Sequence, residues 1–385
     1  MIERKIKSEL LQLAKYFPII TVTGPRQSGK TTLVKSIFSQ YKYINLEIPN
    51  YRNQASLDPV AFLKSFGDNV IIDEAQFVPE IFSAVQVLSD ENEKPGNYIL
   101  TGSQNFLLLK QISQSLAGRV GILKLFPFSY EELVNKPFIE SYKEHMLSGG
   151  YPRLYESQIP PRIFYKNYLD TYISRDVKDF LDVRNEIDFR NLIILLAERS
   201  GQLINYSSLS KALKVDIRTV KSWINILVSS YICFTLSPYF RNKGKSLIKT
   251  PKIYFRDTGL LCYLLNVETD NDFETAGHKG RIFENYIISE KLKKYNNYNI
   301  DSRLYFYRDK NNIEVDLVDE TKGAKYILNE IKAGETYHNK FKSSLVRVSS
   351  ELSVDIDNCC VVYGGSNSFK DEGVNVIDTH KYLCF

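Results

Sequence analysis

The sequence has few of the features that mark secreted and membrane-spanning proteins. It holds only five cysteines in 385 residues, with no C-x-x-C pair, so we expect neither a disulfide framework nor a cysteine-based metal site. No segment approaches the roughly 18 consecutive apolar residues of a membrane span. The start, MIERKIKSELLQLAKYF, is an amphipathic helical pattern without the apolar core of a secretory signal. These absences predict a cytoplasmic protein with no membrane partner, and the length of 385 residues predicts two or three globular domains.

The most informative stretch is IITVTGPRQSGKTTL, at residues 19–33. An apolar β-branched run precedes G-x-x-x-x-G-K-T and a helical pattern follows it, which is the context that a phosphate-binding loop requires. The glycines let backbone N–H groups turn toward phosphate oxygens. Lys30 can reach the β- and γ-phosphates, and the Thr31 hydroxyl can bind Mg²⁺. We therefore predict that ATP is bound by Gly24, Pro25, Arg26, Gln27, Ser28, Gly29, Lys30, Thr31 and Thr32.

A second stretch, NVIIDEAQ at residues 69–76, supports this prediction. Its continuous apolar run is typical of a buried strand in a parallel sheet, and Asp73 and Glu74 follow at the carboxyl end. Asp73 can hold Mg²⁺, and Glu74 can orient or deprotonate the attacking water. Two solvated acids at a strand end are the alternative, which the preceding phosphate-binding loop disfavours.

The segments around these motifs alternate between strand and helix patterns up to about residue 130. This alternation predicts a doubly wound parallel sheet, whose ligands lie at the carboxyl ends of the strands. A strand over 97–105 ends in Ser103, Gln104 and Asn105, so Ser103 or a neighbour is a candidate contact of the γ-phosphate. Arg119 precedes a further edge strand. It can stabilise transition-state charge in cis or across a subunit boundary, or it is a surface residue.

Together, GPRQSGKTTL, VIIDEAQ, LTGSQNF, SLAGR and GGYPRL resemble a large group of prokaryotic AAA-type ATPases. Members of this group join the ATPase core to a C-terminal domain of uncertain function. The resemblance implies an α/β P-loop core, a helical lid above the nucleotide, and assembly into a homo-oligomeric ring. Within the expected lid, Arg175 of YISRDV is a second candidate for a phosphate-sensing or subunit-bridging arginine. Pairing with Asp176 or Asp179 on a solvated face is the alternative.

The middle of the chain is strongly basic. Residues 201–260 hold ten basic side chains against two acidic ones, a net charge of +8 in a chain that carries +5 as a whole. Three helical patterns, one with Ser207 or Ser208 as its expected N-cap, precede a hairpin pattern, which predicts a winged helix-turn-helix. Such a fold can place its third helix in the major groove of DNA and its wing on phosphates. The candidate contacts are Arg218, Lys221, Lys243 and Lys245. A protein-docking module with a solvated basic face is the alternative.

The last part of the chain carries a second set of polar residues. Asp316 lies in the strand pattern NIEVDLVDE, while Glu330 and Lys332 share one face of the strand pattern AKYILNEIKAGE. An Asp and a Glu on neighbouring strands can share a divalent metal, and a nearby Lys can position water. With Glu284 on the preceding helix, this order resembles the restriction-endonuclease-like fold. That resemblance implies the nuclease set Glu284, Asp316, Glu330 and Lys332, with Asp316 and Glu330 holding Mg²⁺; an inactive docking fold is the alternative.

These observations predict an ATP-hydrolysing machine that acts on DNA. Two other hypotheses stay open: a nucleotide-gated switch that docks a protein partner, and a bare ATPase whose ring supports another enzyme. The expected domains are the ATPase core at 1–130, the helical lid at 131–188, the winged helix at 189–260 and the restriction-endonuclease-like domain at 261–385.

Overall fold

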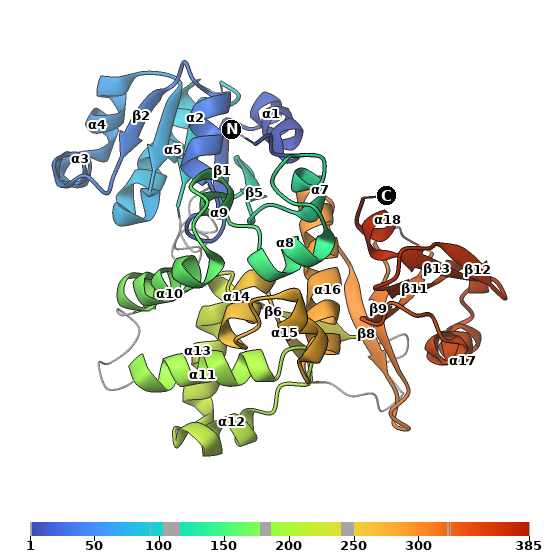
Figure 1. The fold of residues 1–385 in the computed structure, drawn as a ribbon. Helices are drawn as coiled ribbons and strands as arrows, with labels where there is room; N and C mark the ends of the chain where they lie inside the picture. The colour runs from blue at the N-terminus through green and yellow to red at the C-terminus, as the bar shows by residue number, and fades with distance from the viewer. Residues whose placement is uncertain are drawn as a thin grey trace.

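The computed structural model describes residues 2–92, 94–102, 116–177, 186–239, 250–321, 323 and 325–384. Figure 1 shows an N-terminal sheet domain, a helical middle and a C-terminal sheet, with the long helix α16 (Lys279–Asn297) between the last two. Within these residues, none of the helices combines the length and the apolar character needed to cross a membrane.

The N-terminal domain is built around a five-stranded parallel sheet in the order β2-β3-β4-β1-β5. This confirms the predicted α/β fold with a parallel sheet. In chain order the elements are α1 (Lys7–Tyr16), β1 (Ile19–Thr23), α2 (Lys30–Ile37), β2 (Lys42–Asn45), α3 (Pro49–Leu57), α4 (Pro59–Phe66), β3 (Val70–Asp73), α5 (Glu80–Asn92), β4 (Tyr98–Thr101) and β5 (Val120–Lys124).

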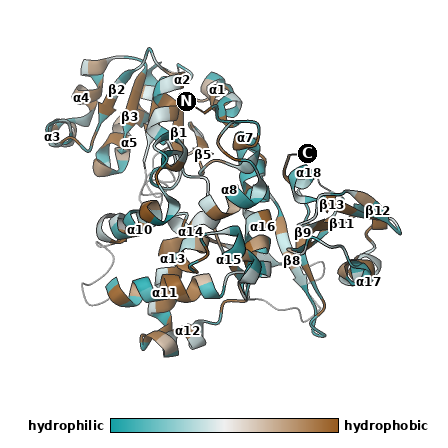
Figure 2. Ribbon diagram, viewed as in Figure 1, coloured by the Kyte–Doolittle hydropathy of each residue, from teal (hydrophilic) through white to brown (hydrophobic). Residues whose placement is uncertain are grey.

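Helices cover both faces of this sheet, which explains why its central strands are apolar on both sides. Ile19 packs with residues of α3, α4 and α5 on one face, whereas Ile20 and Val22 pack with α1 and α2 on the other. Figure 2 shows the corresponding brown strands between helices whose outer sides are teal. Since all strands are parallel, the loops that follow β1, β3 and β4 meet at one edge of the sheet.

The helical middle begins with short helices that lie between the first sheet and the rest of the chain. Helix α9 begins directly after Tyr151, which is its N-cap residue. This part consists of α7 (Tyr130–Leu133), α8 (Tyr142–Ser148), α9 (Pro152–Glu156) and α10 (Pro161–Tyr172), which continues as a π-helical turn over Ile173–Val177.

Three further helices and an antiparallel strand pair follow, in the order that the sequence predicts. The helices are α11 (Glu186–Glu198), α12 (Tyr206–Leu213) and α13 (Ile217–Ser229), and the strands are β6 (Cys233–Pro238) and β7 (Lys252–Phe255). The expected N-cap of α12 was wrong. Asn205, rather than Ser207 or Ser208, caps the helix by accepting the Ser208 N–H at 2.9 Å, because an Asn amide oxygen serves this position as well as a Ser hydroxyl.

The strand pair belongs to a larger sheet that crosses the expected boundary at residue 260. Strand β6 also pairs with β8, so the C-terminal sheet has eight strands in the order β12-β13-β11-β10-β9-β8-β6-β7. The remaining elements are α14 (Thr258–Leu264), α15 (Asp270–Thr275), β8 (Leu304–Arg308), β9 (Glu314–Asp319), β10 (Ile327–Lys332), α17 (Ser343–Leu352), β11 (Cys359–Tyr363), β12 (Phe369–Asp371), β13 (Val374–Asp378) and α18 (Thr379–Cys384).

Helix α16 joins the helical middle to this sheet through one continuous core. Its buried side chains Phe283, Tyr286 and Ile287 belong to a cluster that runs from Ile2, near the N-terminus, to Leu383. Helix α17 packs on the opposite face of the sheet. The strand pair β6–β7 and helix α16 therefore hold the three parts of the chain in contact.

Candidate nucleotide-binding site and a carboxylate cluster

The loop between β1 and α2 has the tight geometry that its glycines permit. Gly24 has φ +145°, and a Cβ at this position would lie 2.1 Å from the carbonyl oxygen of Leu125, so only glycine fits. Gly29 has φ +92° and caps α2. The chain therefore turns sharply out of β1 and directs the first N–H groups of α2 toward the edge of the sheet.

Asp73, at the end of β3, is joined by hydrogen bonds to three surrounding elements. Its Oδ2 accepts hydrogen bonds from the Thr31 hydroxyl at 2.8 Å and from the Tyr43 hydroxyl at 2.7 Å. Its Oδ1 accepts one from the Thr101 hydroxyl on β4. Two segments that the sequence singled out separately thus meet at one point. Tyr43 and Thr101 are additional polar neighbours that the motifs did not reveal.

Glu74 is held in an uncommon backbone conformation beside this aspartate. Its φ is +54°, in the left-handed region, and its carboxylate accepts a hydrogen bond from the Gln76 side-chain amide. Lys30 donates hydrogen bonds from Nζ to the carbonyl oxygens of Gly24 and Pro25, at 3.0 and 2.8 Å. A cation and a carboxylate thus both line the cavity beside the loop.

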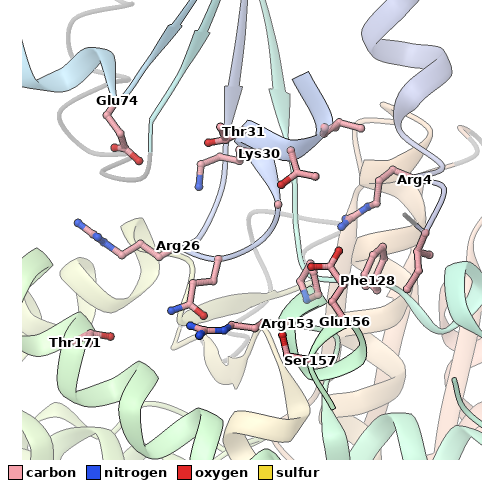
Figure 3. Close-up of a pocket in the computed structure, with 16 residues that line it drawn as sticks. Arg4, Arg26, Lys30, Thr31, Glu74, Phe128, Arg153, Glu156, Ser157 and Thr171 are labelled. Atoms are coloured by element: carbon pink, nitrogen blue, oxygen red, sulfur yellow. The ribbon is translucent and has the colours of Figure 1, made fainter. Parts of the chain in front are cut away.

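A cavity of about 600 Å³ opens at this edge of the sheet. Figure 3 shows Lys30, Thr31 and Glu74 on its sheet side, and Arg153, Glu156 and Ser157 of the α9 region facing them. The volume lies within the range of small-molecule and cofactor sites. Two cationic lining residues, Arg4 and Arg153, come from segments that the sequence analysis did not assign to the site.

Arg4 connects the N-terminal segment to the loop. Its Nη1 donates to the carbonyl oxygen of Ser28 at 3.3 Å, and its Nε pairs with Glu132 at 3.1 Å. Its guanidinium lies 4.3 Å from the centre of the Phe128 ring, which also lines the cavity. Burial lowers the pKa of Arg4 and the nearby Glu132 opposes that effect. The buried pair therefore fixes the position of the cavity wall.

The residues at this edge of the sheet fit a nucleoside triphosphate with Mg²⁺. Loop N–H groups, Lys30 and Arg153 supply positive potential for phosphates. The Thr31 hydroxyl and the Asp73 carboxylate, 2.8 Å apart, are the oxygen donors that Mg²⁺ prefers. Arg26, Gln27, Gly29 and Thr32 also line the cavity.

Arg119 does not reach this site. It precedes β5, and the parallel register pairs Val120 with Ile19 at the start of β1, so Arg119 lies at the opposite edge of the sheet. It forms a two-pronged ion pair with exposed Asp90, including an Nη2–Oδ2 distance of 3.1 Å. The expectation that Arg119 acts in cis was therefore wrong, since a residue before a parallel strand lies far from the loops that follow the strands. A role across a subunit boundary stays a prediction.

The other candidate arginine and the candidate γ-phosphate contact stay predictions. Arg175 lies in the π-helical turn after α10, and its side chain is not described. Ser103, Gln104 and Asn105 lie outside the described residues.

Four basic side chains of α12, α13 and the turn between them lie on the surface, whereas Lys252 of β7 is buried. Arg218 and Lys221 on α13 are exposed, as are Lys211 and Lys214 on and after α12. Lys221 Nζ lies 5.3 Å from the Tyr206 ring centre. Lys243 and Lys245 lie outside the described residues.

The four polar residues predicted in the C-terminal part come together. Asp316 on β9 and Glu330 and Lys332 on β10 face each other, with Lys332 Nζ 2.6 Å from Glu330 and 3.7 Å from Asp316. Glu284 reaches the same place from α16. Burial, then the charge of Asp316, raises the pKa of Glu330 to about 8, and burial also raises the pKa of Glu284.

Two further members of this cluster come from β7, which the sequence assigned to the hairpin. Lys252 Nζ lies 3.0 Å from Glu284 and 2.6 Å from Glu314. The Tyr254 hydroxyl donates to Glu284 at 2.6 Å. Their spacing of two residues on one strand places both on the same face, but no pattern in the sequence shows that this face meets α16.

Comparisons with known proteins agree with the geometry of the first part. Residues 16–134 match the family model described as an AAA domain. Residues 139–271 and 279–382 match two domains of unknown function, DUF8612 and DUF4143. The first part of the chain is thus an AAA-type, P-loop ATPase-like domain, and the other two models assign no activity.

Two relatives that match most of the chain carry names that describe no function. An uncharacterized protein of Mycobacterium tuberculosis is 29% identical over 376 residues, covering 96% of this chain and 82% of that protein. One of Methanocaldococcus jannaschii is 25% identical over 391 residues, covering 93% and 84%.

Two solved structures resemble parts of this chain at low sequence identity. The Walker-type ATPase PABY2304 of Pyrococcus abyssi is 15% identical with a TM-score of 0.42, covering 69% of this chain and 96% of that one. AMPPCP-bound DnaA from Aquifex aeolicus is 15% identical with a TM-score of 0.27, covering 57% and 84%.

Proposed function

We propose that this protein binds and hydrolyses ATP at the edge of the N-terminal sheet, with Mg²⁺ as cofactor. The observation that carries the proposal is the 2.8 Å contact between the Thr31 hydroxyl and Asp73, which joins the end of β3 to the phosphate-binding loop. Bound Mg²⁺ would neutralise phosphate charge and hold the β- and γ-phosphates in place. Thr31 and Asp73 would hold it.

The remaining side chains take roles that follow from their positions. Lys30 leaves the loop carbonyls and binds the β- and γ-phosphates, since its flexible stem lets the ammonium move by a few bond rotations. Glu74 orients the attacking water and takes up its proton, while the Gln76 amide holds the Glu74 carboxylate. Arg153 approaches the phosphates from α9.

The test compares ATP binding and hydrolysis in the full chain and in two variants. Lys30→Ala should lose both, because phosphate binding is removed. Glu74→Gln should still bind ATP but should hydrolyse it at least about 100-fold more slowly, as expected when a positioned base is removed. Arg119→Ala, which alters an arginine at the far edge of the sheet, is the control for hydrolysis in the monomer. Unchanged hydrolysis in Lys30→Ala would refute the assigned site.

We further propose that ATP turnover acts on DNA through the basic helices α12 and α13, as a winged helix would. Four exposed cations on these helices support this: Lys211, Lys214, Arg218 and Lys221. In the double variant Arg218→Ala/Lys221→Ala, the negative slope of log affinity against log salt concentration should become shallower by about 2. Lys340→Ala/Lys381→Ala, which removes two exposed cations of the C-terminal part, should leave the slope unchanged.

Absence of DNA binding at low salt would favour the second candidate, a nucleotide-gated switch that docks a protein. The observation in its favour is that helix α16 touches both the wall of the nucleotide cavity and the C-terminal cluster. Lys293 of α16 donates to the carbonyl oxygen of Phe128 at 3.2 Å, and Glu290 accepts from the Tyr130 N–H at 2.7 Å.

DNA cleavage in the C-terminal part is a further proposal, supported by the convergence of Glu284, Asp316, Glu330 and Lys332. A carboxyl group such as Glu330, whose pKa of about 8 lies near neutrality, can exchange protons during catalysis. Asp316→Ala should abolish cleavage of plasmid DNA, and full retention of cleavage in this variant would remove the proposed site.

A further inference from the structure

The carboxylate cluster of the C-terminal sheet is already occupied by cations of the chain itself. Lys252 has a side chain only 3% exposed and lies within 3.0 Å of two carboxylates, those of Glu284 and Glu314. Lys332 pairs with Glu330 on the other side. Buried charges are stable only when they are paired and hydrogen-bonded, so Lys252 and the two glutamates depend on each other.

The donors expected to hold Mg²⁺ are engaged in other contacts. Asp316 Oδ2 accepts the Ile331 N–H at 2.7 Å, and Glu330 Oε1 accepts from Lys332 at 2.6 Å. Among the residues that the structure describes, no three His, Cys, Asp or Glu side chains are placed to hold a metal ion. The arrangement therefore does not fit the divalent metal that the resemblance implies.

One atom of the cluster nevertheless lacks a partner. The Glu330 side chain is only 9% exposed, and its buried Oε2 makes no hydrogen bond within the described part of the chain. Unsatisfied buried carboxylate oxygens are costly. A cation brought closer to Glu330 would satisfy this oxygen.

We propose that Lys252 is the resident cation of this cluster and that strand β7 thereby closes it to divalent metal. Among the residues that the structure describes, withdrawal of Lys252 leaves the four carboxylates of Glu284, Glu314, Asp316 and Glu330 with ion pairs to Lys332 and to Arg308, whose Nη1 lies 3.4 Å from Glu314. Four oxygen-donating carboxylates with this excess of negative charge would bind a hard divalent cation. The inference does not depend on ATP hydrolysis.

The position of the β6–β7 hairpin allows a ligand to control whether Lys252 stays in the cluster. Strand β7 stands at the end of the eight-stranded sheet beside β6, and backbone hydrogen bonds join its other edge to residues 201–204. The hairpin also follows the basic helix α13, so a ligand that draws the hairpin away from α16 would remove Lys252 from Glu284. The cluster would then change from a closed, lysine-neutralised state to an open, metal-binding one.

The test measures Mn²⁺ binding by electron paramagnetic resonance, without nucleotide, in full-length chains that all carry Asp73→Asn. We expect Lys252→Met to bind Mn²⁺ at least about tenfold more tightly than the chain with Lys252, because four carboxylates lose their main counter-charge. The double variant Lys252→Met/Glu284→Gln should bind Mn²⁺ more weakly than Lys252→Met alone. Lys252→Arg, which keeps the positive charge, should continue to exclude Mn²⁺.

A matched control distinguishes this site from a general effect of losing a lysine. Lys342 also bridges two carboxylates of the same part of the chain, Asp371 at 2.6 Å and Glu372 at 3.0 Å. Lys342→Met should gain no comparable Mn²⁺ binding. Equal Mn²⁺ affinity with and without Lys252, or no binding to folded Lys252→Met, would overturn the proposal.

Loss of Lys252 also removes a buried ion pair, so folding is followed by circular dichroism. If Lys252→Met is unfolded without metal, Mn²⁺ should restore its folded signal, and failure of this rescue would overturn the proposal. The chain that retains Lys252 provides a second readout, because Mn²⁺ should leave its Tm unchanged. If Mn²⁺ raises this Tm and Glu284→Gln abolishes the rise, closure of the cluster by Lys252 is contradicted.

Discussion

The ammonium group of Lys293 donates a hydrogen bond to the carbonyl oxygen of Phe128, over 3.2 Å. Phe128 lines the cavity beside the phosphate-binding loop, and Lys293 lies on α16, which also carries Glu284. The same ammonium pairs with Glu290 at 2.8 Å, and both side chains are only 3% exposed. The wall of the nucleotide cavity is thus attached to the C-terminal part by a buried charged contact.

Lys293→Met should destabilise the protein by about 3 kcal/mol, because it leaves the carboxylate of Glu290 buried without its counter-charge. The double variant Lys293→Met/Glu290→Gln should recover part of that loss, since the uncompensated charge is removed. Urea unfolding followed by circular dichroism measures both. A double variant less stable than the single one would show that the charge of Glu290 is not the cause.

The close approach of the phosphate-binding loop to β5 predicts a sharp contrast between two glycines. Gly24→Ala places a Cβ 2.1 Å from the Leu125 carbonyl oxygen, whereas Gly118, at φ +82°, has no atom within 4 Å of such a Cβ. Both substitutions carry the strain of a positive φ, about 1 kcal/mol. Only Gly24→Ala should lose substantially more stability and ATP binding. Equal losses, measured by thermal unfolding and nucleotide titration, would disprove the steric role of Gly24.

His145 predicts a specific loss of stability in weak acid. Burial, then the charge of Lys293, lowers its pKa from 6.5 to about 3. The neutral ring is matched to its partners, the Tyr286 hydroxyl at 3.0 Å and the Phe128 carbonyl oxygen at 3.2 Å.

As pH falls below the unfolded-state pKa, the unfolded chain takes up a proton that native His145 does not. Stability should therefore fall by about 1.4 kcal/mol per pH unit between the unfolded and native pKa values. His145→Gln should be less stable at neutral pH but should lose less between about pH 7.5 and about pH 5.5. Urea midpoints at several pH values measure this, and parallel pH profiles of the two proteins would refute it.

Arg153 is expected to contribute to ATP binding from the α9 side of the cavity. Arg153→Ala should weaken ATP binding by about tenfold, the size of one hydrogen bond to a charged group. Arg190→Ala is the matched control, because Arg190 is an exposed arginine of α11 that pairs with Asp170. Isothermal titration with a non-hydrolysable ATP analogue compares them, and equal affinities would remove Arg153 from the site.

The sequence predicts those parts of the candidate site that lie in continuous motifs. Lys30, Thr31, Asp73 and Glu74 were identified because each follows an apolar strand at the same edge of a parallel sheet, which is a property of local sequence. Arg119 was misplaced although the same rule covers it, since it precedes its strand and lies at the other edge.

The missing members come from segments that are distant in the chain. Arg4 and Arg153 reach the cavity from before β1 and from α9, and Lys252 reaches the carboxylate cluster from the hairpin. Their placement depends on how helices and sheets pack, and side-chain periodicity does not encode that packing. The sheet that joins β6 to β8 across residue 260 was missed for the same reason.

Helix α16 extends over 19 residues, a rod of about 28 Å at 1.5 Å per residue. Glu284, in its second turn, accepts a hydrogen bond from Tyr254 of the hairpin. In later turns, Glu290 and Lys293 form hydrogen bonds with the backbone of Tyr130 and Phe128. Helix α16 is thus one unbroken element that contacts the carboxylate cluster through Glu284 and the cavity wall through Glu290 and Lys293.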